Sequence, residues 1–176
     1  MTCRRKKAFT LVELLVGIAL AAMLLAAVAA AVHGSLMSQA ANDQVASTTQ
    51  AARFVLDRIT RDIRTAAAVD QYAGTTTITI APPDDGSGLQ QIEYEYDSAN
   101  RALLYRRTVN GNTTTQTLFG GDDKVSVRSF VAIYELGVDW QGMDCTSSVT
   151  IRLEFEVDDE IFAVTASAAP RRNRLY

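Results

Sequence analysis

One acidic residue interrupts a long apolar stretch near the start of the chain. Glu13 lies within the apolar run 8–32, directly after the basic cluster RRKK at residues 4–7. A carboxylate inside a membrane-spanning segment costs at least ~2.5 kcal/mol, and such groups are usually paired and functional. Glu13 is therefore expected to neutralise a positive charge. The alternative is that it sits near the headgroups and reaches out to water.

Side chains for catalysis are sparse. His33 is the one histidine and stands at the expected membrane edge, so no Ser-His-Asp or Cys-His arrangement is available. No Gly-rich phosphate-binding loop occurs. Acidic pairs at 84–85, 122–123 and 158–159 supply oxygen ligands of the kind calcium prefers, but each falls where a turn is needed. The sequence thus predicts no enzyme and no cofactor, with a structural calcium site as the lesser alternative.

The apolar run predicts a membrane anchor. A helix over Phe9–Val32 would be about 36 Å long, enough to cross a hydrocarbon core of roughly 30 Å. The basic cluster favours a cytoplasmic amino terminus, which places everything after Gly34 on the outer side. A cleaved secretory signal ending near the alanines 29–31 is the alternative, but the run is longer than such signals have and contains Glu13.

The helix is expected to continue beyond the membrane. No proline precedes Pro82, so the helix can extend to about Val69, roughly 90 Å from Phe9, with Gly34 and Ser35 the expected place for flexibility. An apolar stripe at three- and four-residue spacing predicts packing on a sheet. Its members are Ala52, Val55, Ile59, Ile63 and Ala66, with Leu56 and Ala67 beside them.

The opposite face of this segment is charged. Asp57 and Arg61 are expected to form an ion pair four residues apart, and so are Arg58 and Asp62, each pair worth only ~0.2–0.5 kcal/mol. Such a face is typical of a solvated helix surface.

From Gly74 the pattern changes to alternating, β-branched segments separated by turns. Asn110-Gly111 is a strong hairpin signal, and Asp158-Asp159 also occupies a turn position. The stretch 137–147 is the least regular. One long helix followed by hairpins predicts an α+β fold, with the helix laid across an antiparallel sheet. The expected strands are 75–80, 89–96, 102–109, 113–119, 125–135 (with a break near Ser129), 149–157 and 161–168.

Residues Lys7–Leu15, KAFTLVELL, resemble the cleavage and methylation motif of type IV pilins and type II secretion pseudopilins. The resemblance implies cleavage between Ala8 and Phe9, methylation of the new Phe9 terminus, and retention of Glu13 as the family glutamate. The residue before the cut is most often Gly in the family, and here it is Ala8. A neighbouring subunit's Glu13 would then neutralise the α-ammonium of Phe9, which favours in-register packing.

Removal of residues 1–8 has two consequences. The leader holds four of the 17 basic residues and none of the 20 acidic ones, so the mature charge changes from −3 to −7. This acidic balance argues against nucleic acid as a partner. Cys3 is lost with the leader, and Cys145 then remains alone, either as a small buried residue or in an intermolecular bridge.

The helix 53–66, the Ile92–Tyr96 strand, the Trp140 loop and the terminal Arg-Arg-Asn-Arg resemble J-type minor pseudopilins and W-type minor pilins. The implied protein is a minor pseudopilin of a type II secretion pseudopilus, with a W-type minor pilin or a membrane-anchored binding module as alternatives. Its implied partners are the prepilin peptidase, other minor and major pseudopilins and the bacterial inner membrane. The expected parts are a leader (1–8), a membrane or filament-core helix (9–33), its amphipathic continuation (34–71) and a periplasmic globular domain (72–176).

Overall fold

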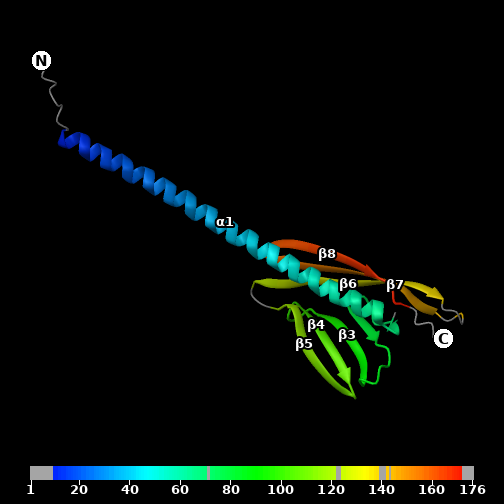
Figure 1. Ribbon diagram of the computed structural model, residues 1–176. Helices are drawn as coiled ribbons and strands as arrows, with labels where there is room; N and C mark the ends of the chain where they lie inside the picture. Colours follow the sequence, from blue (N-terminus) through cyan, green and yellow to red (C-terminus); the bar gives the residue numbers. More distant parts are fainter. Residues whose placement is uncertain (1–9, 71, 122–123, 139–141, 143, 172–176) are drawn as a thin grey trace, which may run out of the picture. The chain divides into compact units, whose positions relative to one another are not determined.

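The computed structural model of the chain describes residues 10–70, 72–121, 124–138, 142 and 144–171. Within them the chain forms one long helix and then antiparallel strands, the α+β arrangement that the sequence predicts (Figure 1). The elements are α1 (Leu11–Thr65), β1 (Ala68–Asp70), β2 (Thr77–Ala81), β3 (Leu89–Asp97), β4 (Ala102–Val109), β5 (Asn112–Gly120), β6 (Val125–Val138), β7 (Asp144–Val157) and β8 (Glu160–Ala168).

The chain divides into two units, Met1–Asp43 and Gln44–Tyr176, and the boundary falls within α1. In the first unit every described residue is exposed, including the apolar ones. Helix continues without a break through Gly34 and Ser35. By length and composition α1 contains a segment able to cross a membrane, and none of that segment is buried. The first unit therefore supplies an apolar helix with no protein covering of its own.

In the second unit, α1 buries the predicted stripe. Ala52, Ile59 and Ile63 are fully inaccessible, and Val55, Leu56 and Ala66 are nearly so. These side chains pack with buried residues of both sheets in one hydrophobic core. Burying each large aliphatic side chain of this kind contributes roughly 1.5–3 kcal/mol. The expectation that this stripe packs on a sheet is confirmed.

The predicted end of the helix is wrong. α1 stops at Thr65, not near Val69, and Ala67 is exposed and not part of the core. The amide of Ala67 donates to the carbonyl of Ala81 at 2.9 Å, which starts the pairing of β1 with β2. The amide of Arg171 donates to the carbonyl of Arg64 at 3.1 Å and satisfies one of the unpaired carbonyls at the helix end. Sheet pairing therefore overrides the helix propensity of the alanines.

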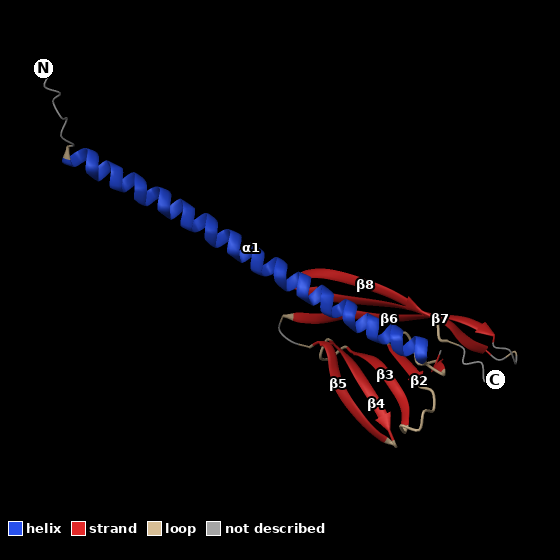
Figure 2. Ribbon diagram, viewed as in Figure 1, coloured by secondary structure: helices blue, strands red, loops and turns tan. Residues whose placement is uncertain are grey.

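The strands form two antiparallel sheets, where the sequence had suggested one (Figure 2). The first has the order β1-β2-β3-β4-β5, and the second the order β6-β7-β8. Hydrogen bonds connect them. The Tyr134 hydroxyl donates to the carbonyl of Thr77 at 2.7 Å, and the Ala132 amide donates to that of Thr75 at 2.7 Å. The two sheets thus share one core beneath α1.

β7 is the central strand of the second sheet and carries the clearest alternation. Val149, Ile151, Leu153, Phe155 and Val157 are all fully buried, as predicted. The break expected near Ser129 is a register shift between Val127 and Ser129 in β6. Within the stretch 137–147, which was expected to be irregular, residues 137–138 belong to β6 and residues 144–147 belong to β7. Trp140 lies outside the described residues.

Two hairpins close through turns with positive φ at both central residues. Asn110 and Gly111 have φ of 48° and 77°, and Asp158 and Asp159 have φ of 49° and 66°. This is the type I′ geometry, which Asn-Gly adopts readily and Asp-Asp adopts with strain. Both turns therefore occur where the sequence predicts them, but only the first has the preferred residues.

Replacing Asp158-Asp159 by Asn-Gly is expected to stabilise the second unit by about 1 kcal/mol, because glycine accepts the left-handed conformation without the Cβ penalty. The midpoint of thermal unfolding should rise by roughly 3–5 °C. The reciprocal exchange, Asn110-Gly111 to Asp-Asp, is the control and should lower it by a similar amount. Equal midpoints for all three proteins would contradict the proposed strain.

Candidate processing and assembly segment

Helix α1 begins with a hydrogen-bonded cap. The amide of Glu13 donates to the hydroxyl oxygen of Thr10 at 3.3 Å, and the amide of Leu14 donates to the Thr10 carbonyl at 3.2 Å. Thr10 is therefore the N-cap, and Thr10-Leu11-Val12-Glu13 has the Thr-x-x-Glu spacing of a capping box. This cap was not predicted, although the spacing itself would have identified it.

Glu13 occupies the first turn of α1, where backbone amides give the helix a positive end. That position favours a carboxylate by roughly 0.3–1 kcal/mol when it is exposed. No described residue forms a hydrogen bond or ion pair with the Glu13 carboxylate, and the residue is exposed. Its carboxylate is thus free to accept a positive group from outside the described part of the chain.

The surroundings of Glu13 are apolar and open. Leu11 is 76% exposed, and Val12, Leu14 and Leu15 are each more than half exposed. Exposed apolar side chains continue along the helix to Val32, which ends the predicted membrane segment. Such a surface is unstable in water and requires lipid or neighbouring helices. Glu13 is therefore held at the start of a helix that must be covered.

The other residues singled out in the sequence are dispersed. Ala8 and Phe9, the predicted cleavage position, lie outside the described residues. His33 is exposed on α1, and Cys145 is half-buried on β7. Searched over its described residues, the chain contains no group of His, Cys, Asp and Glu arranged to hold a metal ion. Asp84 and Asp85 instead accept backbone hydrogen bonds within their own turn.

The prediction of two ion pairs on α1 is wrong. Neither the Asp57–Arg61 pair nor the Arg58–Asp62 pair occurs among the ion pairs of the described residues. Two of these four side chains contact tyrosines of the first sheet instead. The hydroxyl of buried Tyr94 donates to Asp62 at 2.6 Å, and the Arg58 guanidinium lies 4.1 Å from the ring centre of Tyr105. This cluster fastens α1 to β3 and β4.

Two tyrosines are predicted to make the second unit sensitive to alkali. Burial, followed by the hydrogen bond to Asp62, raises the pKa of Tyr94 far above its usual range. Burial, followed by the charge of Asp70, raises the pKa of Tyr134 to about 12. The neutral phenol is thus favoured in the folded state, so its stabilisation is complete below pH ~10, the unfolded value, and is lost as the pH rises above it.

Tyr94 should lower the free energy of unfolding by up to about 1.4 kcal/mol per pH unit above pH ~10, and half-buried Tyr134 should lower it by less and only up to a pH of about 12. Urea unfolding at a series of pH values measures this slope, and phenolate absorbance reports ionisation. Tyr134→Phe should remove one tyrosine's share of the slope. The interpretation fails if stability is unchanged across this range while both tyrosines ionise at their ordinary pKa.

Comparison with known proteins identifies the beginning of the chain. The family described as the prokaryotic N-terminal methylation motif matches residues 3–29, which include Glu13 and the first turns of α1. Comparison with curated proteins gives no match, and comparison with solved structures gives none either. Residues 3–29 carry a prepilin-type N-terminal methylation motif, which overlaps the apolar start of α1 and indicates a type IV pilin-like or pseudopilin-like protein.

Proposed function

We propose that this protein is a minor pseudopilin, a structural subunit at the initiating or tip end of a type II secretion pseudopilus that supports protein export. The observation that carries this proposal is the methylation motif at residues 3–29, joined to an exposed apolar helix whose first turn holds Glu13. Pilin-like proteins of this kind are structural and generally not enzymes.

In this proposal the prepilin peptidase cuts between Ala8 and Phe9, and the new Phe9 terminus is methylated. The apolar part of α1, to about Val32, anchors the subunit in the inner membrane with its amino terminus cytoplasmic and its second unit outside. On assembly the same segment joins the filament core, where Glu13 neutralises the Phe9 ammonium of a neighbour. The partners are the peptidase and other minor and major pseudopilins.

A W-type minor pilin of a type IV pilus is the second candidate, because the same motif and helix serve both machines. A membrane-anchored binding module would share the helix but would not need Glu13. A gene neighbourhood that encodes a secretion machine or a pilus would distinguish the first two candidates.

The mass and amino-terminal sequence of the mature protein, isolated from membranes of its native cell, test the proposal directly. The expected result is a chain that begins with N-methylated Phe9. An intact Met1 or Thr2 terminus would contradict processing and favour the plain anchor. A terminus near His33 would identify a secreted protein and overturn the filament assignment.

A further inference from the structure

β8 is an open edge of the second sheet. It pairs with β7 in unbroken register, and among the described strands it pairs with no other. Edge strands usually carry lysine, proline or a bulge, which discourage further pairing. β8 has none of these, and its one charged residue is Glu160 at its start. β5, an edge of the first sheet, differs because its pairing with β4 has a register shift between Leu103 and Leu104.

A groove lies between the edge of β8 and α1, and it is here named the α1–β8 groove. It is a depression of about 460 Å³ whose lining includes four consecutive residues of β8, 163–166. Successive side chains of a strand point to opposite faces of the sheet. All four residues can therefore border one depression only where the edge of the strand, with its main-chain groups, faces it. Arg53, Leu56 and Asp57 of α1 form the opposite wall.

The apolar side chains of β8 are incompletely covered. Phe162, Val164 and Ala166 pair across the ladder with fully buried residues of β7, yet each of the three is only partly buried. A strand added beside β8 would place its own side chains on the same face and remove these three from water. Extended peptides bind open sheet edges in this way.

The groove is positively charged toward the C-terminal end of β8. Asp57 also lines an adjoining depression of about 360 Å³, whose other charged residues are Arg61, Arg64 and Arg171. With Arg53, four arginines surround one carboxylate, and none of these five side chains takes part in an ion pair of the described residues. The negative end of the helix dipole, roughly half a unit charge, offsets only part of this excess. An acidic segment is therefore the complementary ligand.

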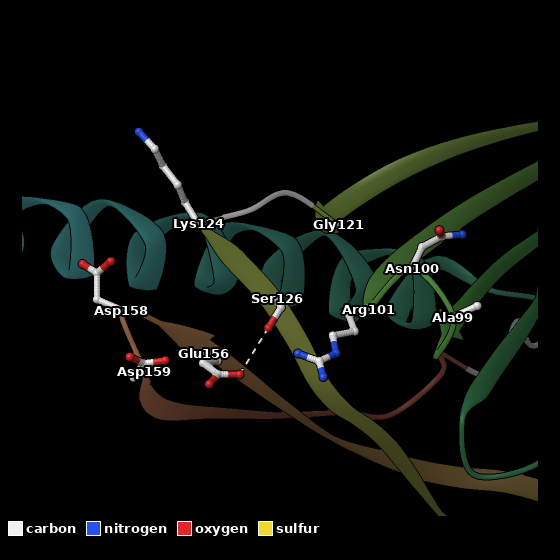
Figure 3. A pocket seen from close by; sticks show the side chains of 9 residues that line it. All are labelled: Ala99, Asn100, Arg101, Gly121, Lys124, Ser126, Glu156, Asp158 and Asp159. Carbon is white, nitrogen blue, oxygen red and sulfur yellow. Dashed lines mark hydrogen bonds between the residues drawn. The ribbon is translucent and has the colours of Figure 1, made fainter.

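The other end of β8 offers no such excess. The turn before β8 borders a depression of about 680 Å³, where Arg101 and Lys124 accompany three carboxylates, those of Glu156, Asp158 and Asp159 (Figure 3). The nine residues of β8 separate this turn from the basic end by roughly 30 Å at about 3.3 Å per residue. The acidic residues of a ligand are thus favoured at one end of the groove only, which determines the direction in which the ligand lies.

We propose that the α1–β8 groove binds an extended acidic peptide of another protein, which adds to the second sheet as an antiparallel strand. Its main chain pairs with the edge of β8, and its apolar side chains cover Phe162 and Val164. Its acidic residues lie at its amino end, beside Arg64 and Arg171, because an antiparallel strand begins where β8 ends. Every strand pair of the described residues is antiparallel as well. This inference goes beyond the function proposed above and does not depend on it.

Binding of a fluorescent nine-residue peptide to the full-length protein in nanodiscs of neutral lipid tests the proposal. The peptide alternates valine with threonine and carries two glutamates at its amino end, and nanodiscs without protein give the background. Saturable binding is expected, about tenfold tighter than that of a peptide with the glutamates at its carboxyl end. The absence of saturable binding up to about 1 mM, or an equal or reversed preference, would overturn the proposal.

Strand addition is recognised by its main-chain hydrogen bonds. Two peptides methylated on alternate backbone nitrogens, odd or even, should differ about tenfold in affinity, because an added strand directs alternate N–H groups to its neighbour. Hydrogen exchange of the β8 amides should slow about tenfold on binding, while β5 serves as the matched edge and stays unchanged. Equal affinities of the two methylated peptides, or unchanged exchange in β8, would exclude addition to this edge.

A charge exchange identifies the basic end of the groove. Replacing the two glutamates of the peptide by lysines should weaken binding to the wild type, and Arg64→Glu should lower this preference for glutamate about tenfold. Arg107→Glu is the matched control, because Arg107 is exposed on β4 and lines neither depression. Equal preferences in the wild type and Arg64→Glu would reject the acidic ligand. A methylated Phe9 terminus together with that result would leave the pseudopilin assignment standing.

Discussion

Replacing Phe155 by Ala should destabilise the second unit by about 3–5 kcal/mol, a large share of the 5–15 kcal/mol typical of a domain. Phe155 is fully buried near the C-terminal end of β7. Its ring contacts Phe119 of the other sheet edge-on, with ring centres 5.4 Å apart, and it stacks on Phe162 of β8 at 5.8 Å. The substitution therefore opens a cavity where the two sheets meet. Pulse proteolysis of the full-length chain in urea measures the loss.

Phe54→Ala is the matched control for this substitution. Phe54 is 70% exposed on α1, so the same chemical change should alter the free energy of unfolding by no more than about 0.5 kcal/mol. If both variants were equally stable, or equally damaged, the packing of Phe155 between the sheets would be refuted.

The sequence predicts these core positions because the apolar residues of a buried face recur at a regular spacing along the chain. The strict alternation of apolar and polar residues from Val149 to Val157 predicts a strand with one apolar face, and the structure confirms this prediction. The stripe on α1 is confirmed for the same reason, since its spacing follows the helical repeat. The hairpin turns are local as well, because Asn110-Gly111 specifies its own backbone geometry.

Features that depend on distant segments were not predicted. β1 follows a run of alanines that favours helix, yet it is a strand because Val69 pairs with Ile80 and its carbonyl accepts the Thr146 hydroxyl at 3.0 Å. The number of sheets depends on which strands pair with one another. The alternation of residues within one strand does not reveal its pairing partners. The charged face of α1 was misjudged likewise, because the tyrosines that contact Arg58 and Asp62 come from β3 and β4.

The candidate site likewise has one feature that the sequence reveals locally and another that depends on residues elsewhere. Glu13 was found because a carboxylate in an apolar run is costly, and the family match covers it. Its role in pairing with a methylated Phe9 remains a prediction, since Phe9 lies outside the described residues. The structure adds a competing role for Glu13, because the residue also stands at the third position of a Thr10-capped helix. A test of Glu13 must therefore separate its charge from its place in the cap.

Glu13→Gln is expected to abolish most assembly while leaving membrane insertion intact. Glutamine keeps the capping-box geometry but removes the negative charge, so a neighbour's Phe9 ammonium would be buried without its counter-ion. An unpaired charge in this setting costs at least about 2.5 kcal/mol, which corresponds to a drop of roughly 60-fold in the association constant. Co-purification with partner pseudopilins from membranes measures the loss, and a carbonate wash verifies insertion.

Thr10→Ala is the matched control, because it removes the cap hydroxyl and retains the charge of Glu13. It should cost about 1 kcal/mol of helix stability and leave most assembly in place. If Glu13→Gln assembled normally while Thr10→Ala and Glu13→Ala both failed, the cap and not the charge would be what Glu13 contributes. If all three assembled normally, the protein would behave as a simple membrane anchor. Charge pairing requires that Glu13→Gln and Glu13→Ala both fail to assemble while Thr10→Ala assembles. The two Glu13 variants lack the carboxylate, whereas Thr10→Ala keeps it.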